Sequence, residues 1–125
     1  MTNIFGEELQ ACCINPLTGY YRDGYCRTDN YDQGKHVVCA IMTAEFLRFS
    51  YKQGNDLITP RLEYDFPGLK PGDKWCLCAL RWREAFDAGF APLVYLEATS
   101  KRALDYLTMD DLIKYAYKKG DVSIR

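Results

Sequence analysis

Turn-forming residues fill two long stretches of this chain and leave few places where regular elements can form. Residues 1–35 contain Asn15-Pro16 and Asp23-Gly24, and residues 55–73 contain Pro67-Gly68 and similar pairs. In residues 1–35, aromatic residues and cysteines are too frequent for a disordered segment. We therefore expect two long structured loops, of the kind that carries function in compact domains. The competing prediction for the first stretch is a hairpin closed by the Asp23-Gly24 turn.

Apolar and capping patterns elsewhere predict short helices and strands. Thr43 is a good N-cap, and Gly54 suits the end of the helix that follows. Because strands and helices are mixed without a regular βαβ rhythm, the predicted fold class is α+β. We expect a single compact domain over residues 1–125, with a small mixed or antiparallel sheet and three to four helices. The predicted elements are a strand or tight helix entry over 37–42, a helix between Thr43 and Gly54, a strand over 74–80, a helix over 83–88 stopped by Gly89, a strand over 93–96, a short helix capped by Thr99 or Ser100, a helix or brief strand over 104–107, and a last helix from Thr108 through Lys118.

Composition and charge exclude several classes of function. The formal net charge is −1 and no basic stripe is present, so we expect no nucleic-acid partner. No stretch approaches the roughly 20 apolar residues of a membrane span, so we expect no membrane partner. The amino terminus lacks the basic and apolar regions of a secretory signal. We therefore expect a cytoplasmic protein with reduced thiols, and we set a disulfide framework aside.

Six cysteines and a single histidine allow a metal site. The predicted strand over 74–80 places Cys76, Cys78 and Leu80 on one face, and His36 is close in sequence to Cys39. Zinc prefers such sulfur and nitrogen donors. Free buried thiols are the alternative, since C-x-C with H-x-x-C is not one of the usual paired C-x-x-C patterns. The candidate zinc ligands are Cys26, His36, Cys39, Cys76 and Cys78, with Cys12 as an alternative to Cys26.

Polar side chains of the two loops predict a second kind of site, beside the strand that carries Cys76 and Cys78. A cysteine nucleophile with His36 as its base, oriented by an aspartate, would be a catalytic arrangement, and an arginine would hold an anionic group. Turn chemistry is the alternative for the aspartates, because an aspartate in a turn often bonds its own backbone. The polar residues expected to converge are Arg22, Asp23, Asp32, His36, Asn55, Asp56, Asp73 and Arg81. The catalytic candidates are His36, Cys39, Cys76, Cys78 and Asp56, and the ligand-binding candidates are Arg22, Asp23, Asn55, Asp56, Asp73 and Arg81.

Aromatic residues support a third hypothesis, a non-catalytic interaction module. Trp75, Trp82 and the loop tyrosines would present an aromatic patch to a partner, since such residues favour interfaces.

Several long runs together resemble one known family. They are Asn15 to Gly24, Gly54 to Leu57 with Thr59-Pro60, and Phe66 to Ala79 with Arg81-Trp82. On these runs, which extend over nearly the whole chain, the sequence resembles a family of small, mainly bacterial proteins known as domain of unknown function 2237. The resemblance implies no particular activity, cofactor or catalytic residue. The family tends to have Ala-Thr-His where this chain has Ala98-Thr99-Ser100, which argues against a mechanism that needs a histidine there.

Taken together, these patterns predict a domain that binds, or acts on, a small polar ligand where the loops meet the cysteine-bearing strand. Structural or regulatory zinc binding and the interaction module are the alternatives. Whether the chain is an enzyme stays open at this point.

Overall fold

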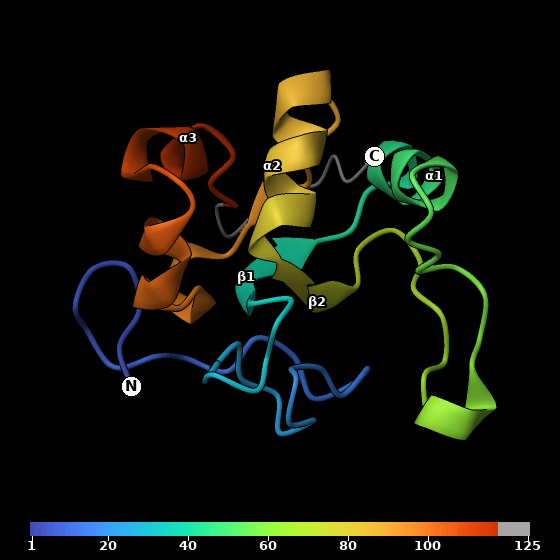
Figure 1. Cartoon of the computed structure of the whole chain (residues 1–125), viewed down its shortest axis with the longest axis horizontal. Helices are drawn as coiled ribbons and strands as arrows, with labels where there is room; N and C mark the ends of the chain where they lie inside the picture. The colour runs from blue at the N-terminus through green and yellow to red at the C-terminus, as the bar shows by residue number, and fades with distance from the viewer. Residues whose placement is uncertain (118–125) are drawn as a thin grey trace.

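A small antiparallel sheet lies at the centre of the chain (Figure 1). The computed structural model describes residues 1–117. The elements are β1 (His36–Ile41), α1 (Ala44–Lys52), β2 (Lys74–Cys78), α2 (Ala79–Ala88), β3 (Leu93–Val94) and α3 (Met109–Lys114), with 3-10 turns at Leu62–Tyr64, Leu96–Ala98 and Lys101–Asp105. The strand order is β2-β1-β3, and β1 pairs antiparallel with both neighbours. The predicted α+β class with a small antiparallel sheet is confirmed.

The sheet is covered on both faces. Figure 1 shows α2 on one side of β1 and β2, between α1 and α3, while the amino-terminal segment passes along the other side. The larger core includes Val38, Leu77 and the fully buried Trp82. A smaller cluster, which we call the sulfur cluster, contains Cys12, Cys26, Cys39, Cys76 and Ala98 on the side of the amino-terminal segment. The tryptophans do not form the predicted surface patch, because Trp75 is only 7% exposed and Trp82 is 0% exposed.

Local capping chemistry explains where two helices begin. The Thr43 hydroxyl accepts a hydrogen bond from the Phe46 amide at 3.1 Å, and Thr108 accepts one from Asp111 at 3.2 Å. Each threonine thereby satisfies one of the free amides of a first helical turn. Gly54, with a φ of 89°, follows the end of α1 as predicted.

The second helix starts earlier than predicted. The strand ends at Cys78 instead of Leu80, and α2 follows at Ala79 instead of Arg83. Trp82 and Ala85 are buried on the side of α2 that packs on the core. Ala79 is buried on the same side, three residues before Trp82. This helical spacing of buried residues outweighs the strand-like alternation that the sequence showed up to Leu80.

The carboxyl-terminal elements are shorter than predicted. The strand expected over 93–96 is the two-residue β3, followed by a 3-10 turn. The predicted short helix is the 3-10 turn Lys101–Asp105, capped by Ser100, and it includes the start of the segment over 104–107 that was predicted as a helix or a brief strand. The last helix, α3, ends at Lys114, since Ala116 instead forms a bridge with Val94. Lys118, the predicted helix end, lies outside the described residues.

The hairpin predicted around Asp23-Gly24 does not form, because residues 1–35 contain no strand. Only isolated bridges, such as the one between Ile14 and Leu17, occur among them. The Asp23-Gly24 pair makes a turn in which the Gly24 amide donates to the Thr18 carbonyl at 2.9 Å.

Two disulfides hold this segment to the sheet. Cys12 is bonded to Cys39 of β1, and Cys26 to Cys76 of β2. The prediction that the cysteines stay reduced is therefore wrong for these four. The partners are 27 and 50 residues apart in sequence, so their pairing depends on how the segment folds over the sheet and not on any local pattern. Cys13 and Cys78 are free thiols.

Within residues 1–117, no helix has both the length and the apolar character needed to cross a bilayer.

Removing either disulfide should lower the free energy of unfolding. By the loop-closure entropy of 27 and 50 residues, the Cys12→Ser/Cys39→Ser and Cys26→Ser/Cys76→Ser variants should lose about 3.5 and about 4 kcal/mol. Urea unfolding followed by tryptophan fluorescence, in the presence of a metal chelator, measures both losses. Cys13→Ser is the control and should leave stability unchanged. Losses below about 0.5 kcal/mol in both double variants would contradict the cross-links.

Candidate active site

The single histidine of the chain is held by a buried carboxylate. His36 Nδ1 lies 2.6 Å from Asp32 Oδ1, and the His36 amide donates to Asp32 Oδ2 at 2.9 Å. The Thr28 hydroxyl donates to the same Oδ2 at 2.9 Å. The Asp32 side chain is 0% exposed, whereas that of His36 is 35% exposed. A carboxylate bonded to Nδ1 holds the proton there and leaves Nε2 free to accept another.

Hydrogen bonding keeps Asp32 ionised. Burial acts to raise the pKa of Asp32, but the hydrogen bonds from the His36 amide and ring, together with the one from the Thr28 hydroxyl, outweigh burial and lower that pKa below its ordinary value. The carboxylate is therefore charged at neutral pH and stabilises an imidazolium if His36 takes up a proton.

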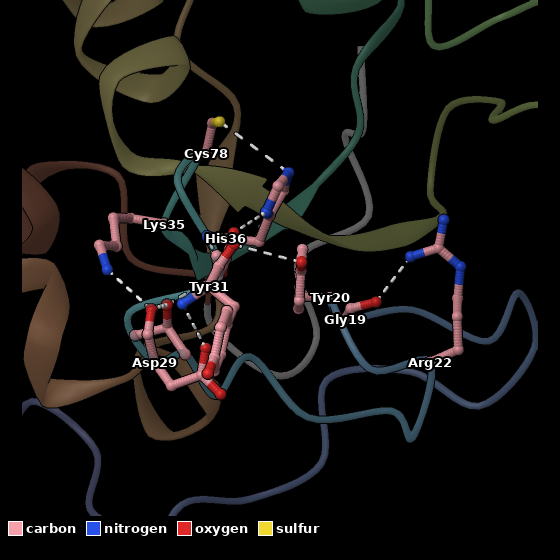
Figure 2. A network of polar contacts seen from close by, with 10 residues as sticks. Gly19, Tyr20, Arg22, Asp29, Tyr31, Lys35, His36 and Cys78 are labelled. Carbon is pink, nitrogen blue, oxygen red and sulfur yellow. Dashed lines mark hydrogen bonds and ion pairs between the residues drawn. The ribbon is translucent and has the colours of Figure 1, made fainter.

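A free thiol faces the other ring nitrogen. Cys78 Sγ lies 4.0 Å from His36 Nε2. Figure 2 marks this contact between Cys78 and His36 with a dashed line. With the contact from His36 to Asp32, the cysteine, the histidine and the aspartate form a continuous chain. The separation exceeds a short catalytic hydrogen bond, and contacts of this kind commonly tighten only when a substrate binds. Burial raises the pKa of the Cys78 thiol, the Asp32 charge adds to this effect, and Arg81 opposes it. The resting thiol is consequently protonated at neutral pH, and it needs a base to become a nucleophile.

A β-bulge places the histidine beside this thiol. Cys39 pairs with Cys76 and His36 pairs with Cys78, so three steps along β1 match two steps along β2. Side chains three residues apart normally point to opposite faces of a strand. The extra residue in β1, between His36 and Val38, turns the imidazole to the face that carries Cys76 and Cys78.

Little space remains between Gly34 and the side chains of His36 and Cys78. A Cβ atom on Gly34 would lie 2.8 Å from His36 Cε1 and 2.9 Å from Cys78 Sγ, so a larger residue there requires movement. Lys35, between Gly34 and His36, has a φ of 49°, a conformation that costs energy for a residue with a side chain. The Lys35 ammonium donates to the Asp29 carbonyl at 2.8 Å, and the backbone carbonyl of Lys35 accepts from the Ala79 amide at 3.0 Å. The turn from Asp32 to His36 is thus held from several sides in a strained shape, a condition often found at functional sites.

His36 also lines a cleft of about 500 Å³, a volume typical of small-molecule sites. The walls come from both turn-rich segments and from β2. The lining residues are Gly19, Tyr20, Arg22, His36, Asp56, Leu57, Arg61, Tyr64, Phe66, Trp75 and Cys76. Tyr20 stacks against the His36 ring with 6.1 Å between the ring centres. Figure 2 shows Arg22 far from Cys78, with Tyr20 between them in this view.

The charged groups of the cleft favour an anionic ligand. Arg22 and Arg61 contribute two guanidinium groups against the single carboxylate of Asp56. The Arg22 side chain donates to the Gly19 carbonyl at 2.6 Å, and its guanidinium carbon lies 5.1 Å from the centre of the Trp75 ring. Hydrogen bonding from Thr59, supported by the Ile58 amide and the Arg61 charge, lowers the pKa of Asp56.

The structure brings together only part of the predicted set. Arg22, His36, Asp56 and Cys76 line the cleft. The other four ligand-binding candidates have different contacts: Asp23 pairs with Arg27, the Asn55 carbonyl accepts from Ser50, Asp73 bonds the Lys70 amide, and Arg81 bonds Glu84 and the Gln53 carbonyl near Cys78. Sequence reasoning counted Asp32 among the converging residues but did not identify it as the aspartate that orients the His36 ring. That contact depends on the turn between Asp32 and His36. Sequence reasoning missed Gly34 and Arg61, for which no local pattern exists.

The disulfides narrow the catalytic and metal candidates. Cys39 and Cys76 have no free thiol in this structure, so Cys78 is the catalytic cysteine candidate that keeps one. The five predicted zinc ligands divide between two places. Cys26, Cys39 and Cys76 belong to the sulfur cluster, whereas His36 and Cys78 contact each other.

Comparison with known proteins identifies the family. The model of an uncharacterised protein family conserved in bacteria, DUF2237, matches residues 2–116. The chain belongs to this family. The predicted resemblance is thus confirmed. No curated protein matches the chain.

Replacing Asp32 should change how stability depends on pH. The pKa of Asp32 is depressed in the folded state, so its contribution is fully present above its unfolded pKa near 3.8 and is lost as pH falls through the lower folded value. Asp32→Asn should therefore cost about 2–3 kcal/mol at neutral pH, and this cost should shrink below about pH 4. Urea unfolding at a series of pH values measures it. The exposed Asp105→Asn variant is the control, and a cost that does not change with pH would contradict this assignment.

Gly34→Ala should separate the histidine from the thiol, because the added methyl group has no room between them. Imidazole NMR reports on this directly, since the chain has one histidine. We expect the Nε2 environment to change while the hydrogen bond from Nδ1 to Asp32 persists. Gly6→Ala is the control for an added methyl group: a Cβ atom there meets nothing within 4 Å, and although its φ of 79° makes alanine costly, the imidazole spectrum should stay unchanged. An unchanged spectrum in Gly34→Ala would show that the contact is not tight.

Proposed function

We propose that this protein is a cysteine-dependent acyl-transfer enzyme or hydrolase that acts on a small anionic substrate. The observation that carries the proposal is the chain of contacts from Cys78 through His36 to the buried Asp32, at the edge of a ligand-sized cleft. A nucleophile, a base and a group that orients the base are the parts that covalent catalysis by a weakly acidic thiol needs.

The proposed reaction begins when Cys78 Sγ attacks the carbonyl carbon of an ester or thioester. The thiol proton passes to His36 Nε2, and the resulting imidazolium is stabilised by the Asp32 carboxylate. Nε2 then returns this proton to the leaving group as the bond between the carbonyl carbon and that group breaks. Water, or another acceptor, gives a proton to the same nitrogen as it attacks the acyl-cysteine, and the thiol is regenerated.

The start of α2 supports the developing negative charge. Cys78 is the N-cap of this ten-residue helix, and its side chain makes no capping hydrogen bond. The amides of Leu80 and Arg81 occupy the second and third helical positions, which have no acceptor within the helix. Amides at such a position stabilise an oxyanion, and the helix dipole adds to the effect.

The cleft accounts for substrate selection. Cys78 is not one of its lining residues, whereas His36 belongs to both places. The reacting carbonyl group therefore lies on the Cys78 side of the imidazole, and the rest of the substrate extends past Tyr20 into the cleft. A carboxylate or phosphate at the far end reaches Arg22, which the Gly19 carbonyl holds in place.

Model esters test the proposal. In a Cys13→Ser background, which removes the other free thiol, the 4-nitrophenyl monoester of succinate should release one equivalent of nitrophenol in a burst and leave an acyl group on Cys78, seen by mass spectrometry. Cys78→Ser should abolish the burst. His36→Gln should slow it by about 10²–10⁴-fold, the usual contribution of a general base.

A matched neutral ester, the 4-nitrophenyl ester of methyl succinate, tests the anion preference. Arg22→Gln should lower the rate for the anionic ester and leave the rate for the neutral ester nearly unchanged. If His36→Gln does not change the rate of acylation, Cys78 reacts without a base, as any accessible thiol does, and the proposal is overturned.

A further inference from the structure

The sulfur cluster brings four cysteines together in an arrangement of two and two. Cys39 and Cys76 are direct partners across β1 and β2. Cys12 and Cys26 come from the amino-terminal segment that lies over them, and each is bonded to one of the strand cysteines. Two ligands from a sheet and two from an adjacent loop could surround one point between them.

The spacing of the sulfur atoms suits a metal ion. The Sγ atoms of Cys12, Cys26 and Cys39 all lie within 4.8 Å of one another; the Sγ atom of Cys76 is outside this group and is connected to it by its bond to Cys26. A tetrahedral zinc site has zinc–sulfur distances of about 2.3 Å, so its sulfur atoms are about 3.8 Å apart. Opening both disulfides would lengthen the distance within each pair and shorten by at most about 1 Å the distances from Cys26 to Cys12 and Cys39. We propose that the reduced protein binds one zinc ion through Cys12, Cys26, Cys39 and Cys76.

Contacts other than the disulfides hold three of the four residues in place. The Cys39 amide donates to the Thr99 hydroxyl at 3.2 Å, and the Cys76 amide donates to the Thr18 hydroxyl at 2.8 Å. The Cys12 amide donates to the Gly24 carbonyl at 2.7 Å. These hydrogen bonds do not involve sulfur, so they remain when the disulfides are reduced, and the thiols of Cys12, Cys39 and Cys76 stay close to one another.

The surroundings of the cluster are closed and fit a structural site. The four cysteines are between 0% and 4% exposed, and the small Ala98 completes the cluster. Tyr95 packs against the cluster, and Lys74 Nζ lies 4.8 Å from the centre of the Tyr95 ring. The Lys74 ammonium therefore puts one positive charge near a site of four thiolates. A closed site with four sulfur ligands and no open position is typical of structural zinc.

The two states are related by balanced chemistry. A dithiol reductant gives two electrons and two protons to each disulfide and becomes a disulfide itself. The four thiols then lose four protons as they bind Zn²⁺. In a reducing compartment, where disulfides are rare, zinc takes over the linkage of the amino-terminal segment to the sheet.

Cobalt binding tests the site directly. The Cys13→Ser/Cys78→Ser protein, which keeps only the four cluster cysteines, is reduced, freed of reductant without oxygen, and titrated with Co²⁺. We expect one equivalent to bind with the intense visible bands of tetrahedral cobalt and the charge-transfer absorption of four thiolates. Zinc should displace the cobalt, and a chromophoric chelator competition gives its affinity.

Loss of one ligand provides the matched variant. Cys26→Ser in the same background should reduce the charge-transfer absorption by about a quarter and weaken zinc binding at least about 10-fold. The spectrum of the parent protein decides the question even if this variant does not fold. A pale octahedral cobalt spectrum, or no binding by the reduced parent, would overturn the proposal. So would zinc binding that is unchanged in Cys26→Ser. None of these outcomes involves the reaction proposed for Cys78.

Discussion

The pairing of β1 with β2 is the constraint on which both sites depend. One register places Cys39 opposite Cys76 and, beyond the bulge, His36 opposite Cys78. A slip of one residue would move each of these side chains to the other face of its strand. Both valines at the bulge, Val37 and Val38, are fully buried in the larger core. A slip of one residue would take both valines out of their packed positions, so their burial favours the register that places the histidine.

The amino-terminal segment converts this register into a site. It supplies Asp32 to hold the imidazole, Tyr20 to stack on it, and Arg22 to line the cleft. The segment contains no helix or strand, so isolated hydrogen bonds place it, such as those from the Ile4 amide to the Thr99 carbonyl and from the Gln10 amide to the Glu97 carbonyl. Its two disulfides add covalent links to the sheet, and the Thr18 hydroxyl adds a contact to the Cys76 amide. A segment without regular elements is thus held in a precise arrangement by hydrogen bonds and cross-links together.

Features that depend on residues close in sequence could be predicted, whereas features that depend on distant residues could not. The caps at Thr43 and Thr108 depend on amides three residues away, and the sequence contained all of that information. The contact between His36 and Cys78 spans 42 residues and requires both the strand register and a bulge, for which no sequence signal was recognised. The disulfide partners were missed for the same reason. The helix start at Ala79 shows a different limit: an alternating run was compatible with a strand or a helix, and packing against the core decided between them.

Cys76 connects the sulfur cluster to the proposed active site. Its sulfur is bonded to Cys26, and the same residue lines the cleft beside His36 and Trp75. If the cluster binds zinc when reduced, Cys26 and Cys76 must move apart, and the cleft wall at β2 adjusts with them. Cys39 is held by its strand, β1, and by the Thr99 hydroxyl. The movement of the sulfur atoms therefore falls mainly on the amino-terminal segment, which also supplies Tyr20 and Arg22. The state of the sulfurs would then affect which ligands the cleft accepts, whereas the contact between His36 and Asp32, held by its own turn, would change least.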